Sequence, residues 1–268
     1  MSEDANVVEW VGRAIDEAHA DQPVATRRQM IAGAAATLGG MGLMGALPSL
    51  ASASVSSDNS TTNILTVAAT AEVLATIVNT VGYRRGLGGD AVTQRNVGAA
   101  AREELIHYNV LASVGAKPAT KEIWVPDAVF ANRTSFLSTL EVGDQIFVNA
   151  YLIGTKHFAA QRNAAYAVIT AEFMGVEAVH RALARQSLGK LGNDRVFMKF
   201  DQRENAPDAP NKGQRGFEDI LMAVKQLEAA GFGFGKAGAS PGRFFHFDTV
   251  KQHTPTDPDL NTRTPDAV

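Results

Sequence analysis

The residues most able to do chemistry in this chain are two pairs of glutamate and histidine. The stretch ELIH runs from Glu104 to His107, and the stretch EAVH runs from Glu177 to His180. A step of three residues brings both side chains to nearly the same face of a helix, where they can reach one metal ion. Random placement of the chain's 13 Glu and 6 His would give about 0.3 such spacings. Two such spacings exceed this number, and they make the four residues candidate metal ligands.

Two further glutamates lie in helical segments that are otherwise apolar. Glu72 is the one charged residue within residues 63–83, and the residues three and four positions away from it are alanine or threonine. Glu141 follows Leu140 on a face whose other residues are typical of a core. Because charged groups are rarely buried unless they are paired or bind a metal, Glu72 and Glu141 are also candidate metal ligands.

Four long helices are expected to position these side chains. Apolar residues recur with helical spacing in four segments, which are residues 63–83, 93–113, 135–158 and 161–189. The third segment also contains residues that favour strands, such as Phe147 and Val148. Its length and the neighbouring helices favour a helix.

The lengths of the connections predict how the helices are joined. Short connections join the first helix to the second and the third to the fourth, which favours two antiparallel hairpins. The connection at residues 116–134 can extend to about 60 Å, twice the ~30 Å length of a twenty-residue helix. It can therefore run the full length of the helices. The pattern predicts an all-α four-helix bundle with one long crossover between helices 2 and 3, followed by a C-terminal extension.

The amino-acid composition limits the kinds of metal site and of binding partner that this chain can have. Hydrophobic residues make up 45% of the 268 residues, which is enough for one substantial domain with a core. The chain has no cysteine, so disulfides, thiolate metal sites and iron–sulfur clusters are excluded, and His and carboxylate must hold any metal. Without residues 1–53 the chain has 22 acidic and 22 basic residues. Such a chain has no net positive charge that would attract nucleic acid.

Residues 1–53 are expected to be an export signal. Arg27 and Arg28 directly precede a stretch rich in Gly and Ala, which ends in an A-x-A sequence at residues 51–53. This arrangement is similar to a twin-arginine signal with cleavage after Ala53, followed by a polar linker at residues 54–62. A membrane anchor is the alternative, but five glycines weaken it. We therefore expect a periplasmic, cell-envelope or extracellular protein without a stable membrane anchor.

The ordered set of candidate ligands resembles that of the ferritin-like family. In that family, one Glu on each of two helices and one Glu-x-x-His on each of the other two hold a di-iron or di-manganese site. The resemblance covers residues 63–189. With an export signal before the bundle and a long extension after it, the chain is similar to secreted ferritin-like proteins, which include desiccation-related members.

The resemblance implies a role for each candidate ligand. Two carboxylates would bridge two metal ions, Glu104 and Glu177. Two carboxylates and two imidazoles would be terminal ligands, namely Glu72, Glu141, His107 and His180. The implied cofactor is two iron ions, with manganese as the alternative, because carboxylate and imidazole suit both metals. Glu103 and Asp144 are expected to be solvated or to support a ligand rather than bind metal, and Tyr151 is expected to belong to the core.

The C-terminal extension is expected at residues 190–253. It contains a polar loop, a short amphipathic helix within residues 217–231 and a tract rich in glycine and phenylalanine at residues 232–247. The phenylalanines would form an exposed apolar patch unless the tract folded against the bundle. Residues 254–268 are expected to be a disordered tail.

Two functions are compatible with these features. The first is an exported metalloprotein whose dinuclear centre reacts with dioxygen or peroxide, either oxidising ferrous iron or removing an oxidant. The alternative is a non-enzymatic envelope protein for stress or desiccation, in which the acids form a metal-free polar core. The sequence leaves open whether the chain forms a homo-oligomer.

The export signal can be tested by changing both Arg27 and Arg28 to Lys. We expect the variant to accumulate inside the cell as its precursor, because the twin-arginine route requires the arginine pair. Cell fractionation checks this, and sequencing of the exported wild-type protein should give Ser54 as its first residue. Continued export of the variant in mature form would contradict the twin-arginine interpretation.

Overall fold

Helices make up most of the described residues in this computed structural model, which covers residues 59–193 and 217–256. The predicted export signal at residues 1–53 and nearly all of the predicted tail lie outside the described residues. Four helices have 23 to 28 residues each, namely α3 (Thr61–Arg84), α4 (Ala91–Ser113), α5 (Arg133–Ala160) and α6 (Ala164–Ser187). The expectation that the fold is mainly helical is confirmed.

Each long helix begins at a polar side chain that caps it. Four caps accept a hydrogen bond from the backbone N–H three residues later, namely Ser60, Asp90, Asn132 and Asn163. Such a bond satisfies an N–H group that has no partner within the helix. The first three helices consequently begin two residues before their predicted starts. The fourth begins three residues after its predicted start, because Arg162 adopts a turn conformation with φ 58°.

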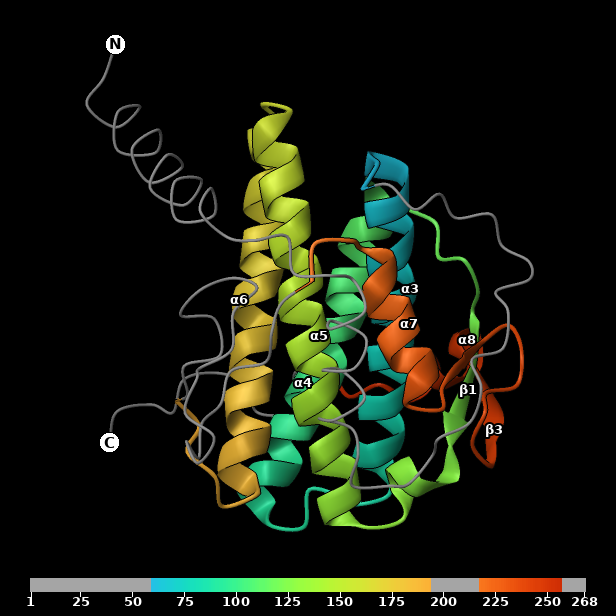
Figure 1. Cartoon of the computed structure of the whole chain (residues 1–268). Helices are drawn as coiled ribbons and strands as arrows, with labels where there is room; N and C mark the ends of the chain where they lie inside the picture. The colour runs from blue at the N-terminus through green and yellow to red at the C-terminus, as the bar shows by residue number, and fades with distance from the viewer. Residues whose placement is uncertain (1–58, 194–216, 257–268) are drawn as a thin grey trace, which may run out of the picture. The chain divides into compact units, whose positions relative to one another are not determined.

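The helices pack in pairs. α3 packs along α4 and α5 packs along α6, and α3 also contacts α5. The connections within the two pairs span only residues 85–90 and 161–163, so each pair is an antiparallel hairpin. Figure 1 shows that the connection after α4 runs beside the helices toward the opposite end, where α5 begins. The long helices thus enclose a common interior.

The long connection contains a strand that the sequence analysis did not predict. β1 (Glu122–Pro126) pairs antiparallel with β2 (Gly233–Phe234) on one side and with β3 (Gly242–His246) on the other. The expectation of an all-α chain was therefore wrong at this point. Ile123 and Val125 are fully buried. Local patterning could not show the pairing, because the partner strands come more than a hundred residues later in the chain.

The described part of the C-terminal extension packs against the long helices. α7 (Leu221–Ala229) contacts α3 and α5. The amide of Asn149 anchors the segment before α7, because it donates to the Phe217 carbonyl at 2.7 Å and accepts from the Phe217 N–H at 3.0 Å. After β3, the short helix α8 (Phe247–Val250) packs on α3 and buries Phe247 completely. Residues 194–216 of the predicted extension lie outside the described part.

α3 is the core helix of the described region. By length and composition it could cross a membrane, and no other helix of residues 59–193 and 217–256 passes that test. However, 83% of its apolar window is buried inside the protein. Glu72 lies in the middle of this helix and is fully buried. A carboxylate in such a position needs partners from the neighbouring helices.

The path of the long connection can be tested with spin labels at Ser113 and Ser135. The labels should be about 35 Å apart, because the chain must travel the length of a 23-residue helix at about 1.5 Å per residue before α5 begins. Pulsed electron paramagnetic resonance measures this distance. A control pair across the short α3–α4 turn, at Arg84 and Val92, should give a much shorter distance. Equal short distances for both pairs would contradict the described course of the chain.

Candidate metal centre

Acidic and imidazole side chains from all four long helices meet in one buried cluster. The cluster consists of six residues, namely Glu72 from α3, Glu104 and His107 from α4, Asp144 from α5, and Glu177 and His180 from α6. The three glutamates are fully buried, and the other three residues are at most 8% exposed. Buried charged groups of this density require compensation by a partner or a cation.

The cluster divides into two overlapping groups of four. One group contains Glu72 and His107, and the other contains Asp144 and His180. Glu104 and Glu177 belong to both groups. Within each group, one candidate ligand atom from every residue lies within 4.8 Å of the others. Both groups of Glu, Asp and His could therefore hold a metal ion.

The two shared glutamates each face both histidines. His107 Nδ1 lies 3.6 Å from Glu104 Oε2 and 3.4 Å from Glu177 Oε1. His180 Nδ1 lies 3.1 Å from Glu104 Oε1 and 3.4 Å from Glu177 Oε2. Each carboxylate thus turns one oxygen toward each imidazole. The two Glu-x-x-His pairs face one another across the interior, as a pair of adjacent cation positions requires.

The hydrogen bonding of the cluster is consistent with metal ligation. Eight buried side-chain atoms of the six residues make no hydrogen bond of good geometry, although the imidazole Nδ1 atoms lie 3.1 to 3.6 Å from the carboxylates. They include both carboxylate oxygens of Glu104 and Glu177 and the Nδ1 atoms of His107 and His180. Leaving buried acceptors unsatisfied is unfavourable, so their concentration at one point indicates that another group belongs there. Carboxylate and imidazole donors suit iron or manganese, so the residues present fit a metal.

Without a metal, protons can balance the charge of the cluster. Burial raises the pKa of Glu72 and Asp144 well above the usual range, with repulsion from neighbouring carboxylates adding to it and the attraction of His107 and His180 acting against it. Burial acts to lower the pKa of His107, but the surrounding glutamates outweigh it and raise that pKa to about 12. For Glu104, the opposing effect of burial is outweighed by His107 and His180, which lower its pKa. Without metal, these shifts favour protonated imidazoles together with protonated carboxyl groups at Glu72 and Asp144.

The structure does not bring Glu141 into the cluster, contrary to the sequence-based expectation. The Glu141 carboxylate instead lies 2.5 Å from the Arg185 guanidinium and 2.5 Å from the Lys190 ammonium. These two cations already balance its charge. Asp144, one helical turn further along α5, supplies the carboxylate that was expected from Glu141.

A heptad pattern in α5 could have identified Asp144. Leu137, Asp144, Tyr151 and Phe158 recur at intervals of seven residues, and all four side chains are at most 4% exposed. Seven residues are close to two helical turns, so these residues form one stripe on the buried face of α5. Asp144 interrupts an otherwise apolar stripe, whereas Glu141 lies beside it. The position of an acidic residue on the buried stripe therefore indicates the candidate ligand better than the choice between Glu and Asp does.

Three residues around the cluster hold its members in place. Glu103 Oε2 lies 2.6 Å from His180 Nε2, which leaves Nδ1 of that imidazole directed toward the carboxylates. The Tyr151 hydroxyl donates to Glu72 Oε1, and the His107 ring stacks on Phe173 with ring centres 3.9 Å apart. Tyr151 was expected only as a core residue, and Glu103 was expected to be solvated or to support a ligand. Neither spacing nor composition indicated which histidine Glu103 would contact.

Two matched variants distinguish Asp144 from Glu141 as the α5 ligand. Asp144→Asn should lower anaerobic loading with ferrous or manganous ion from two equivalents to about one, because it removes a charged ligand from one group only. Glu141→Gln removes the same charge from a residue outside the cluster and should leave loading unchanged. Elemental analysis of the dialysed proteins measures the ratio of metal to protein. Reduced loading of Glu141→Gln together with unchanged loading of Asp144→Asn would instead identify Glu141 as the ligand from α5.

Comparison with protein-family models, with curated proteins and with solved structures finds no match to this chain.

Proposed function

We propose that this protein is a ferritin-like metalloprotein with a dinuclear iron or manganese site that reacts with dioxygen or peroxide. The observation that carries the proposal is the pair of four-residue groups that share Glu104 and Glu177. Two such groups, built from all four long helices, match the ligand arrangement of di-metal carboxylate proteins with Asp144 in place of one glutamate. The twin-arginine-like sequence supports an exported location.

In this proposal each candidate ligand has a defined part. Glu104 and Glu177 would be ligands shared by both metal positions, because each turns one oxygen toward each histidine. The remaining four residues would each hold one metal ion, namely Glu72 and His107 in one group and Asp144 and His180 in the other. The four carboxylates carry four negative charges when ionised. Two divalent cations balance them, so metal can take the place of the protons in the buried cluster.

The chain's own residues would bind and shield the reacting centre. A dinuclear iron or manganese centre supplies two electrons, one from each ion, for the reduction of dioxygen or peroxide. Glu103 fixes the ring of His180, and the hydroxyl of Tyr151 fixes one oxygen of Glu72. The ring of Phe173 covers His107 and limits the access of water to that side.

The long connection also supports the proposed family. A ferritin-like bundle has one long crossover between its second and third helices, and such a connection allows those two helices to be parallel. The chain between α4 and α5 has the length for this crossover and runs beside the helices (Figure 1). The strand β1 within it is an addition that the proposed family pattern does not require.

Metal loading and thermal stability test the proposal. The full chain, reconstituted anaerobically with ferrous ion, should bind two equivalents and then consume dioxygen. Ligand at one hundred times its dissociation constant stabilises a protein by about 2.7 kcal/mol. The melting temperature should therefore rise by roughly 5–10 °C for each ion in a chain of this size. Glu104→Gln and Glu177→Gln should each abolish loading at both positions, whereas the exposed Glu172→Gln should have no effect.

The metal-free polar core remains the second candidate function. It is favoured by the ion pairs of His107 and His180 with the buried glutamates, at 3.1 to 3.6 Å, which already compensate part of the charge. A wild-type protein that binds clearly fewer than two equivalents, and that gains no thermal stability from iron or manganese, would favour this alternative. It would then be a non-enzymatic envelope protein for stress or desiccation.

A further inference from the structure

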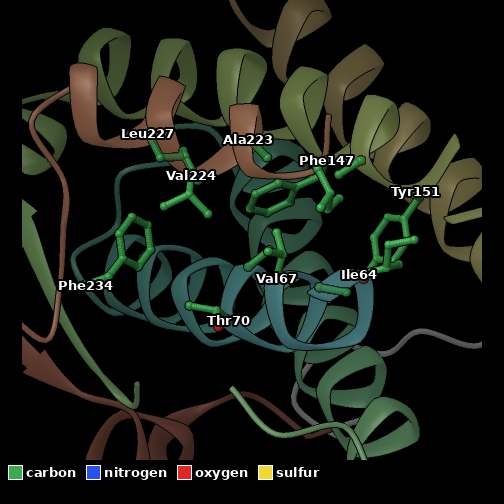
Figure 2. A pocket seen from close by; sticks show the side chains of 13 residues that line it. Ile64, Val67, Thr70, Phe147, Tyr151, Ala223, Val224, Leu227 and Phe234 are labelled. Carbon is green, nitrogen blue, oxygen red and sulfur yellow. The ribbon is translucent and has the colours of Figure 1, made fainter. Parts of the chain in front are cut away.

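An apolar cavity lies next to the candidate metal centre, between α3, α5 and α7. Its wall consists of 13 residues, and the space among them that the centre of a water-sized molecule can occupy is small, about 20 Å³. Figure 2 shows Val224 and Leu227 of α7 on one side of this space and Val67 and Ile64 of α3 on the other side. The C-terminal extension therefore forms the outer wall of the cavity.

The wall has no free polar group. Only two of its residues carry a hydroxyl, Thr70 and Tyr151. Thr70 Oγ1 donates to the Thr66 carbonyl at 2.7 Å and accepts from the Ala119 N–H at 2.9 Å. The Tyr151 hydroxyl donates to Glu72. A polar molecule that entered the cavity would therefore give up its hydrogen bonds to water without replacing them. An apolar molecule has no such hydrogen bonds to give up.

The cavity and the metal centre share Tyr151. The ring of this residue lines the cavity, and its hydroxyl contacts a candidate metal ligand. Ala68 and Ala71 of the cavity wall are also within one helical turn of Glu72. On the other side of the centre, Asp144 and His180 face a second pocket whose wall is partly polar, with Asn79, Asn96 and Ser187. The centre thus has one apolar side and one polar side.

We infer that the cavity between α3, α5 and α7 receives dioxygen and delivers it to the metal centre. This inference rests on the proposed function and narrows it, because it selects dioxygen over peroxide. Dioxygen is small, uncharged and apolar, as the wall requires. Hydrogen peroxide donates and accepts hydrogen bonds, so it would reach the centre through the polar pocket or not at all. With iron bound, the centre would supply two electrons, one from each ferrous ion, and dioxygen would take them up with two protons and leave as hydrogen peroxide.

Xenon binding tests the cavity without any metal. Xenon is an apolar probe that occupies dry cavities in proteins. Metal-free full-length protein should bind xenon in this cavity, as measured by crystallography under xenon pressure or by xenon nuclear magnetic resonance. Ala223→Leu places extra carbon atoms in the cavity and should abolish xenon binding. Ala229→Leu, an exposed change on the same helix, should leave binding unchanged. If Ala223→Leu does not fold, Val224→Phe fills the same space.

Oxidation kinetics then test delivery. Ala223→Leu should still bind two ferrous ions, but stopped-flow oxidation by dioxygen should be several-fold slower than in the wild type and in Ala229→Leu. Oxidation by hydrogen peroxide, which takes two electrons and two protons to become two waters, should be unchanged. Absence of xenon from the wild type, an acyl chain in the cavity, or equal slowing with both oxidants would overturn the inference.

Metal loading separates this inference from the proposed function. If the wild type does not load metal, the proposed function is wrong and dioxygen cannot be the occupant, even where xenon binds. If the wild type loads two ions but dioxygen oxidises Ala223→Leu at the wild-type rate, only the delivery through this cavity is wrong.

Discussion

The burial of four carboxylates at one point constrains the rest of the structure. Glu72, Glu104, Asp144 and Glu177 come from four different helices, and none of them is more than 4% exposed. Carboxylates in such a setting repel each other and lose hydration, so they persist only with compensating charge. Two histidines provide part of it. The helices must therefore hold six polar side chains together against the tendency of the apolar residues to exclude them.

The need for compensating charge also explains why the two neighbouring acids on α5, Glu141 and Asp144, have different roles. Glu141 has a longer side chain and lies near Arg185 and Lys190, so it forms ion pairs with both. Asp144 has a short side chain on the buried stripe and faces the cluster instead. Its charge is compensated there by protons or by a cation. Compensation at two separate places lets α5 carry two acids within one helical turn.

The C-terminal extension completes the surroundings of the centre. α7 covers the apolar faces of α3 and α5, and the strands after it join β1 in the long connection. The extension therefore links the connection between α4 and α5 to the outside of the helices. One result is a candidate metal centre with chemically different pockets near it, an apolar one beneath α7 and a partly polar one beside Asp144 and His180. Helices alone would have left the apolar side open to water.

The sequence by itself determined the four long helices and most of the cluster. Apolar periodicity and polar caps are local properties, and the spacing of Glu104 with His107 and of Glu177 with His180 already placed each pair on one helix face. The isolated charge of Glu72 in an apolar helix indicated its burial. Only the tertiary structure decided between Glu141 and Asp144, because that choice depends on the position of two cations from α6 and the residues after it. The tertiary structure also determined the sheet, because β1 forms a strand by pairing with β2 and β3, which lie more than a hundred residues later in the chain. Contacts between distant segments leave no local pattern, and this is why the sequence could not reveal them.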